Sequence, residues 1–189
     1  DSFNTAVGHG AGESVTTGPL NTLVGGLAGL ALTSGNNNTA LGYAALSTDT
    51  LGDRNVAIGV SALAAQNFTT STDAYNVAVG YEAGNDITTG VKNVLIGGLA
   101  GDAIQDADNN TAIGFQSLST NQLGSASVAV GADALLDQNP ATATLMYNVA
   151  VGYHAGRLIS TGIQNTCIGG LAGDAMTTGS SNTFVGMQA

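Results

Sequence analysis

Few side chains in this sequence are of the types that carry out catalysis. The two histidines are His9 and His154, and neither has a serine or cysteine partner at the spacing of a nucleophilic triad. His9 occupies a position that is tyrosine, Tyr81 and Tyr153, in matching segments farther along the chain. A residue that the matching segments exchange in this way is better explained as part of the surface, so we expect no catalytic residues and no enzyme.

Carboxylates are the second candidates, because pairs of acidic side chains cleave polysaccharides in glycoside hydrolases. The aspartates that lie close together are Asp102, Asp106 and Asp108, and farther on Asp133 and Asp137. Only Asp102 recurs, as Asp174, which favours a scattered acidic surface that keeps the chain soluble. Calcium at Asp106 and Asp108 is an alternative, but the Gly-Gly-x-Gly-x-Asp repeat of calcium-binding β-rolls is absent, and we expect no metal.

Charge and hydropathy exclude several classes of function. Lys and Arg number 3 against 13 Asp and Glu, and the net charge of −10 argues against nucleic-acid binding, which needs cations to neutralise phosphates. The longest apolar run, residues 23–32, is interrupted by glycines and too short to cross a bilayer, so we expect no membrane insertion by this segment. Glycine pairs such as Gly25-Gly26 lack the Lys-Ser/Thr of a phosphate-binding loop, and we expect no cofactor. The single cysteine, Cys167, replaces leucine of matching segments and is interpreted as an apolar filler.

An internal repeat organises the whole chain. The phrase Asn-(Thr/Val)-small-(Val/Ile/Leu)-Gly occurs eleven times, once with serine in the first place. Three 17-residue spacings between successive copies are followed by one 21-residue spacing, and this series recurs as a 72-residue superperiod. We expect a single repeat domain over residues 1–189, with superrepeats at about 4–75, 76–147 and a partial 148–189, cut from a longer array.

The repeat predicts an all-β fold, a parallel β-solenoid of about eleven coils. A 17-residue period is too short for paired-helix repeats, and each copy has a short alternating segment rich in Val, Ile and Thr between Asn and Gly. Equivalent strands then stack about 4.8 Å apart, and eleven coils make a rod of roughly 50 Å.

Alternation within the strand assigns side chains to the two faces of the sheet. The fourth position of the phrase is always Val, Ile or Leu, so we expect it, with the second, to face the interior. The third position, mostly Ala but Leu23, Leu95, Cys167 and Phe184 in some copies, is then expected to face outward. An apolar outer face needs cover, and sister chains are the simplest cover.

The first and fifth positions predict two structural columns. Stacked asparagines can bond to one another, which predicts a ladder of Asn4, Asn21, Asn38, Asn55, Asn76, Asn93, Asn110, Asn148, Asn165 and Asn182. Independent surface turns are the alternative. The invariant glycine indicates either positive φ or close backbone approach at a corner, formed by Gly8, Gly25, Gly42, Gly59, Gly80, Gly97, Gly114, Gly131, Gly152, Gly169 and Gly186.

The two 21-residue copies carry four extra residues each, in the segments 66–75 and 138–147. Such insertions map to loops, and these two are expected on one side of the rod, about 19 Å apart. Candidate contacts to a ligand or to a neighbouring chain are Phe68, Asp73, Tyr75, Pro140, Met146 and Tyr147. Plain spacer loops are the other interpretation.

The repeated phrase resembles two families of surface proteins. Segments such as Asn55-Val-Ala-Ile-Gly59 resemble the head repeats of trimeric autotransporter adhesins, and Asn38-Thr-Ala-Leu-Gly-Tyr-Ala-Ala-Leu46 resembles repeats of phage tail fibres that end in an endosialidase-type chaperone. The resemblance covers the whole chain. It implies a left-handed β-roll, three chains side by side, and display outside the cell or on a virion, with a receptor or glycan as a possible partner. The coil length and the 72-residue superperiod depart from the adhesin pattern.

These observations favour a structural or adhesive segment of an extracellular homotrimeric fibre. A polysaccharide-cleaving fibre domain is one alternative. A left-handed β-helix acyltransferase is another, supported by Val7/Ala11 and Val79/Ala83, although a 17-residue coil is not three hexapeptides. An ice-binding solenoid is a third, although no uninterrupted Thr-x-Thr file runs through the repeats.

Overall fold

The computed structural model describes residues 2–189, and over this range the chain contains only strands. Eleven three-residue strands form the main sheet: β1 (Thr5–Val7), β2 (Thr22–Val24), β3 (Thr39–Leu41), β5 (Val56–Ile58), β7 (Val77–Val79), β8 (Val94–Ile96), β9 (Thr111–Ile113), β11 (Val128–Val130), β13 (Val149–Val151), β14 (Thr166–Ile168) and β15 (Thr183–Val185). Two further pairs are β4 (Gly52–Asp53) with β6 (Thr72–Asp73), and β10 (Gly124–Ser125) with β12 (Thr144–Leu145).

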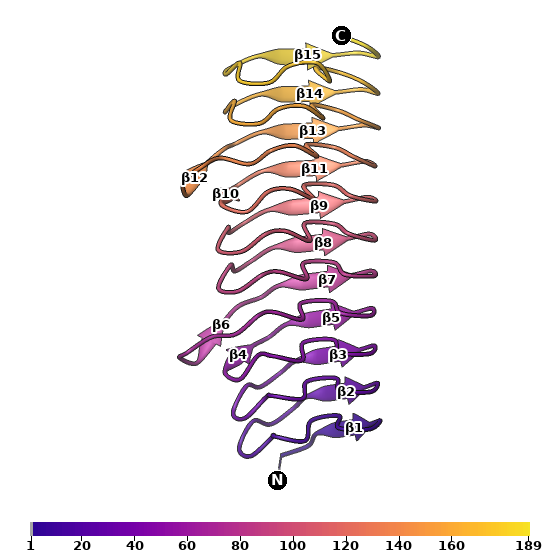
Figure 1. The fold of residues 1–189 in the computed structure, drawn as a ribbon, viewed down its shortest axis with the longest axis vertical. Coiled ribbons are helices and arrows are strands. Elements are labelled where there is room, and N and C mark those ends of the chain that lie inside the picture. Colours follow the sequence, from indigo (N-terminus) through magenta and orange to yellow (C-terminus); the bar gives the residue numbers. More distant parts are fainter. Residues whose placement is uncertain (1) are drawn as a thin grey trace.

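The chain is a parallel β-solenoid, as the repeat predicts. Every strand of the main sheet pairs in parallel with the strand of the next coil, so that Thr5 lies opposite Thr22, and Val56 lies opposite Val77 across the longer coil. Figure 1 shows the eleven strands stacked in one column from the N-terminus to the C-terminus. We number the coils 1–11 and begin each one at the first position of the phrase, so that coil 1 starts at Asn4 and coil 8 at Ser127.

The corner that follows each strand explains the invariant glycine. At all eleven fifth positions φ lies between +128° and +144°, a region in which residues with a side chain are strained. The next coil also passes too close for a side chain, since a Cβ at Gly97 would lie 2.5 Å from the carbonyl oxygen of Gly114. Positive φ and close backbone approach, the two explanations that the sequence left open, therefore both apply at this corner.

The predicted assignment of the two sheet faces is wrong. The third-position residues point into the solenoid and are fully buried from coil 2 to coil 10, including Leu23, Ala112 and Cys167. The fourth-position residues lie on the outer face, where Ile113 is 36% and Ile168 is 42% exposed. Period-two alternation shows that the two sets lie on opposite faces but does not say which face is inside. The interior of a 17-residue coil is narrow, and most coils have room only for alanine at this position.

The packing of the core follows the same four-coil superperiod. In some coils the ninth position is leucine and the twelfth is polar, as in Leu46/Asp49, Leu63/Gln66, Leu118/Asn121 and Leu135/Gln138. In others the ninth is glycine and the twelfth is aliphatic, as in Gly29/Leu32, Gly84/Ile87, Gly101/Ile104 and Gly156/Ile159. A Cβ at Gly29 would lie 2.7 Å from Leu23 Cδ2 and 3.0 Å from Leu32 Cδ1, so the two arrangements fill the same space.

Candidate functional site

The asparagine ladder runs inside the solenoid, along the start of every strand. Wherever the preceding coil also begins with asparagine, the backbone N–H of an asparagine donates to the side-chain Oδ1 of the preceding one: Asn38 N–H donates to Asn21 Oδ1 at 2.9 Å, and Asn110 N–H to Asn93 Oδ1 at 3.0 Å. In several coils an amide–amide bond accompanies it, as between Asn55 Nδ2 and Asn38 Oδ1 at 3.1 Å. Most bonds of the ladder therefore join a backbone N–H to a side-chain oxygen, and fewer join two side-chain amides.

The ladder asparagines of the 17-residue coils also close their own coils. In the 17-residue coils the Nδ2 group donates to a carbonyl near the end of the same coil, as from Asn76 to Gly90 at 2.8 Å and from Asn93 to Ala107 at 2.9 Å. From Asn21 to Asn165 these asparagines are at most 1% exposed. Amides buried in this way must be fully bonded to be tolerated, so the ladder is a structural column with no atom free for a ligand.

The two long coils project their extra residues on the same side of the rod, where Figure 1 shows β6 and β12. Phe68, Pro140 and Met146 are buried, so the prediction that they contact a ligand or a neighbouring chain is wrong. These apolar side chains fill the space under the loops. From the sequence alone, an apolar residue in a loop that packs inside the protein cannot be distinguished from one that contacts a ligand or another chain. Asp73, Tyr75 and Tyr147 are exposed and stay candidates for contact.

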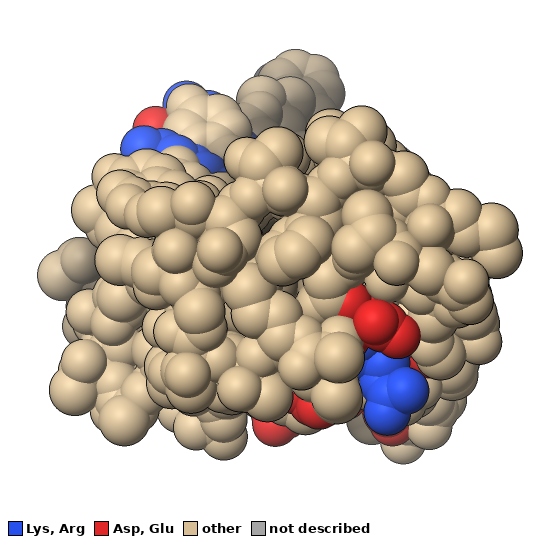
Figure 2. Space-filling model, turned by 90° about the horizontal axis from the view of Figure 1, so that it is seen from above, with Lys and Arg blue, Asp and Glu red and all other residues tan. Residues whose placement is uncertain are grey.

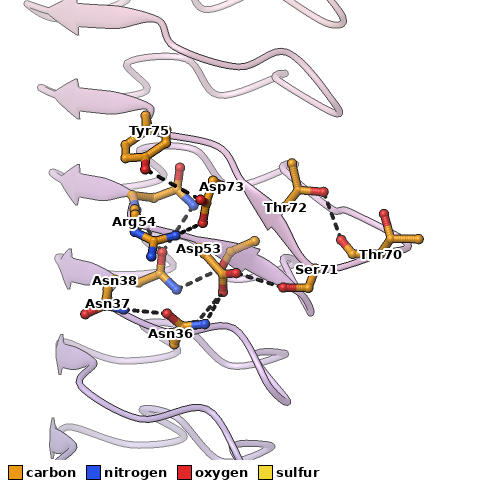
Figure 3. Close-up of polar contacts among 12 residues, drawn as sticks. Asn36, Asn37, Asn38, Asp53, Arg54, Thr70, Ser71, Thr72, Asp73 and Tyr75 are labelled. Atoms are coloured by element: carbon orange, nitrogen blue, oxygen red, sulfur yellow. Dashed lines mark hydrogen bonds and ion pairs between the residues drawn. The ribbon is translucent and has the colours of Figure 1, made fainter.

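The first loop is fastened by a polar cluster (Figure 3). The buried carboxylate of Asp53 accepts from Asn36 N–H at 2.8 Å, from Asn36 Nδ2 at 2.7 Å and from Ser71 Oγ at 2.9 Å. Arg54 forms an ion pair with Asp73, and its guanidinium lies 5.7 Å from the centre of the Tyr75 ring. These contacts tie the loop of coil 4 to coil 3, and Asp53 in turn ties coil 3 to coil 2. The charged groups are therefore engaged in bonds within the chain.

The second loop has a different chemistry at the same positions. One superperiod after Asp53, Arg54, Asp73 and Tyr75, the chain has Ser125, Ala126, Leu145 and Tyr147. At these four positions the first loop presents a charged cluster, whereas the second has two small residues and an exposed leucine, and the exposed tyrosine is common to both. The loops also share exposed residues elsewhere, such as Thr70 and Thr142.

Two buried polar pairs lie at the bases of the loops. Asp49 Oδ1 accepts from Gly52 N–H at 3.0 Å, and its Oδ2 accepts from Gln66 Nε2 at 2.6 Å. The equivalent pair is Asn121 and Gln138, where the amide nitrogen of Asn121 takes the place of the second oxygen. Gln138 Nε2 is consequently buried without a partner among residues 2–189. Desolvation raises the pKa of Asp49, although the bond from Gln66 opposes this effect.

The raised pKa of Asp49 leads to a testable pH dependence. Between the ordinary value of 3.8 and the raised value, the folded chain holds a proton that the unfolded chain has released. Asp49 therefore lowers the free energy of unfolding as the pH rises through this interval. We expect the stability of Asp49→Asn, relative to the wild-type chain, to rise with pH over the interval and to level off above it. Denaturant titrations at a series of pH values measure the difference, and a flat or falling difference would contradict the assignment.

The remaining candidate residues are dispersed and satisfied locally. His154 Nε2 lies 2.9 Å from Asp133 Oδ2, and the imidazole stacks on Tyr153 with 3.8 Å between the ring centres. His9 lies in the exposed first coil. Burial raises the pKa of the Cys167 thiol, which is an apolar filler inside the solenoid and not on the outer face where the third position was expected.

The clustered aspartates bond to separate partners in neighbouring coils. Asp102 accepts from Ser119 Oγ at 2.6 Å, and burial raises its pKa. Asp106 accepts from the hydroxyls of Thr88 and Thr89, both at 2.7 Å, and these bonds lower its pKa. Over residues 2–189 no group of three or more His, Cys, Asp or Glu side chains is placed to hold a metal ion, and no pocket is present.

The most extensive surface feature is the outer face of the main sheet. Its exposed fourth-position residues are Val7, Leu41, Ile96, Ile113, Val151, Ile168 and Val185. Beside them, the exposed sixth-position residues are Tyr43, Val60, Tyr81, Phe115, Tyr153 and Met187. The second position adds threonine and valine, and valine at β5, β7, β8, β11 and β13 interrupts the threonines. The result is an apolar strip along the whole rod, which we call the sheet strip.

Large and small residues alternate along the edge of the sheet strip. Aromatic rings occupy the sixth position in coils 3, 5, 7 and 9, and glycine, alanine or valine occupies it in the coils between. The Tyr43 ring leans over Gly26, since a Cβ at Gly26 would lie 3.3 Å from Tyr43 Cδ2, and Phe115 lies over Gly98 in the same way. The alternation gives each ring room to lie along the surface. Figure 2, viewed along the rod, shows a surface that is mostly uncharged, with charged atoms in only a few places.

Comparisons with known proteins add no relative. A scan of protein-family models, a search of curated proteins and a search of solved structures each return no match for this chain. In the part of the chain that the structure describes, no helix has the length and apolar character needed to cross a membrane.

Proposed function

We propose that this chain is a non-enzymatic, structural segment of an extracellular homotrimeric fibre, either a phage tail fibre or a bacterial surface adhesin. The observation that carries the proposal is the sheet strip, an apolar face that runs along all eleven coils. The number of chains and the place outside the cell come from the resemblance of the repeat to fibre and adhesin repeats.

The size of the sheet strip suits association of copies of the same chain. Eleven strands about 4.8 Å apart, with outward side chains from the second to the sixth position, span on the order of 700 Å² of flat sheet. Monomeric proteins rarely expose one apolar patch of more than about 600 Å², and stable interfaces bury about 800 Å² per partner. The sequence predicted that sister chains cover the alanine face of the sheet, but that face already lies inside the solenoid. In this proposal sister chains cover the sheet strip instead.

The remaining features suit a rod under mechanical load. The glycine corners allow the backbones of successive coils to approach closely, and the asparagine ladder bonds each coil to its neighbours. Side-by-side chains would present three copies of each loop, and multivalent display strengthens weak binding. In this proposal Asp73, Tyr75 and Tyr147 are the exposed loop residues that a cell-surface receptor or glycan would meet.

The mass of the chain in solution tests the proposal. We expect sedimentation equilibrium to give about three times the chain mass of 18.5 kDa. Ile113→Lys places a charge in the middle of the sheet strip, and an uncompensated buried charge costs several kcal/mol, so the concentration needed for association should rise at least about tenfold. Gln122→Lys, an exposed site in the same coil but off the strip, is the matched control. A single-chain mass for the wild-type protein would overturn the proposal.

A further inference from the structure

Coils 4 and 8 form a natural pair for comparison within one molecule. Both are 21-residue coils, they lie one superperiod apart, and each carries a projecting loop. Coil 4 follows three full coils, and coil 8 precedes two full coils and the eight residues 182–189 of coil 11. Both therefore lie inside the stack, and neither is a terminal coil.

The asparagine ladder is continuous at coil 4 and interrupted at coil 8. Asn55 Oδ1 accepts from Asn76 N–H at 3.2 Å, which joins coil 4 to coil 5. Ser127 takes the place of Asn55, and its hydroxyl donates to Gln138 Oε1 at 3.1 Å. Among residues 2–189 no ladder bond joins Asn148 N–H to Ser127, because the serine side chain is too short to replace the amide. The junction between coils 8 and 9 lacks this buried ladder bond, although His154 bonds to Asp133 across it at 2.9 Å, where the equivalent residues of coils 5 and 4 are Glu82 and Ser61.

The junction between coils 7 and 8 is weaker as well. Gln66 Nε2 donates to Asp49 in the preceding coil, whereas Gln138 Nε2 is buried with no partner in the described part of the chain. Asp133 Oδ1, also in coil 8, is the other buried side-chain atom without a partner there. A buried polar atom without a partner has lost its bonds to water and gains no bond within the protein in return, which destabilises the folded coil.

The loop of coil 8 also lacks the polar side-chain links of its counterpart. Asp53 binds Ser71 and Arg54 pairs with Asp73 in the first loop. The second loop has Ala143 in place of Ser71, and its other equivalents are likewise unable to form these links. The strand pair β10–β12 holds the base of the second loop, as β4–β6 holds the first.

We infer that the solenoid has a built-in weak point at coil 8, where the interior of the stack opens first under heat, denaturant or tension. In a repeat rod each coil contacts only its neighbours, so stability is close to a sum of terms for coils and for junctions. Coil 8 combines a gap in the ladder and a buried amide without a partner with a loop that lacks the side-chain links of the first loop, and opening there separates coils 1–7 from coils 9–11. Local opening of this kind occurs below the free energy of global unfolding.

Native-state hydrogen exchange on the full chain tests the inference with matched amides. Val56 N–H bonds to Asn76 O across the junction after coil 4, and Val128 N–H bonds to Asn148 O across the junction after coil 8, both at 2.9 Å. We expect Val128 to exchange at least tenfold faster than Val56. Equal rates, or faster exchange at Val56, would overturn the inference.

Two reciprocal substitutions separate the effect of the ladder gap from other causes of fast hydrogen exchange at coil 8. Ser127→Asn restores the missing rung in a setting that Asn55 and Gln66 already show to be compatible, and it should slow exchange at Val128 about fivefold without changing Val56. Asn55→Ser creates the gap in coil 4 and should speed exchange at Val56 by a similar factor. Absence of both changes, or equal changes in all coils, would contradict a weak point at coil 8. Neither result bears on whether the chain forms a trimer.

Discussion

Replacing Gly97 with alanine is expected to destabilise the solenoid by about 4 kcal/mol. Gly97 lies at the corner after β8 with φ of +137°, where an L-residue is strained. The added Cβ would also lie 2.5 Å from the carbonyl oxygen of Gly114 in the next coil. That neighbour is backbone and cannot rotate away, so the stack of coils must separate locally. Chemical denaturation followed by circular dichroism measures the loss.

Gly98→Ala is the matched control for this prediction. Gly98 is the next residue in the chain, its φ is not positive, and an added Cβ would meet only the Phe115 ring at an ordinary 3.6 Å. We expect a change within about 0.5 kcal/mol, since alanine also lowers the entropy of the unfolded chain. Similar losses for the two variants would show that the corner geometry is not what requires glycine.

Asn93→Ala should destabilise the chain by about 3 kcal/mol, because it leaves two buried backbone groups without partners. Asn93 Oδ1 accepts from Asn110 N–H at 3.0 Å, and Asn93 Nδ2 donates to Ala107 O at 2.9 Å. The side chain is fully buried, so water cannot replace either bond without opening the coil. The difference in free energy of unfolding between variant and wild type is the measurement.

An exposed asparagine controls for the change of residue type. Asn67 accepts one exposed bond from Thr50 Oγ1 at 3.0 Å. Asn67→Ala is expected to change the stability by no more than about 0.5 kcal/mol. If both variants lose the same amount, the asparagine column does not stabilise the stack.

The sequence was sufficient to predict the stacking and the common geometry of the coils, because both follow from spacing. The two spacings between copies of the phrase predict which residues become neighbours, and the structure has Thr5 opposite Thr22 and Val56 opposite Val77 as expected. Invariant glycine likewise indicated a place where a side chain cannot fit. The spacing of the repeats is sufficient for these predictions, even when the packing inside the coil is unknown.

The inside and outside of the sheet could not be predicted in the same way. The expectation that aliphatic residues face inward fails here because the coil is narrow, and Ala112 fills the interior while Ile113 lies outside. The buried pairs Asp49–Gln66 and Asn121–Gln138 were also missed. The signal that could have found them is the leucine that lies three residues before each of these polar residues. Its regular occurrence indicates that the four polar residues occupy equivalent places inside the solenoid.

The central claim is that matching positions of successive coils lie on one line, one strand spacing apart. It can be tested by measuring the distance between spin labels at Thr70→Cys and Thr142→Cys, in a Cys167→Ala background diluted with unlabelled chain. Both threonines are exposed at equivalent places in the two loops, four coils apart. Pulsed electron paramagnetic resonance should give a single peak at about 19 Å, widened by the label linkers. A peak at more than twice that distance, or a featureless distribution, would contradict the claim.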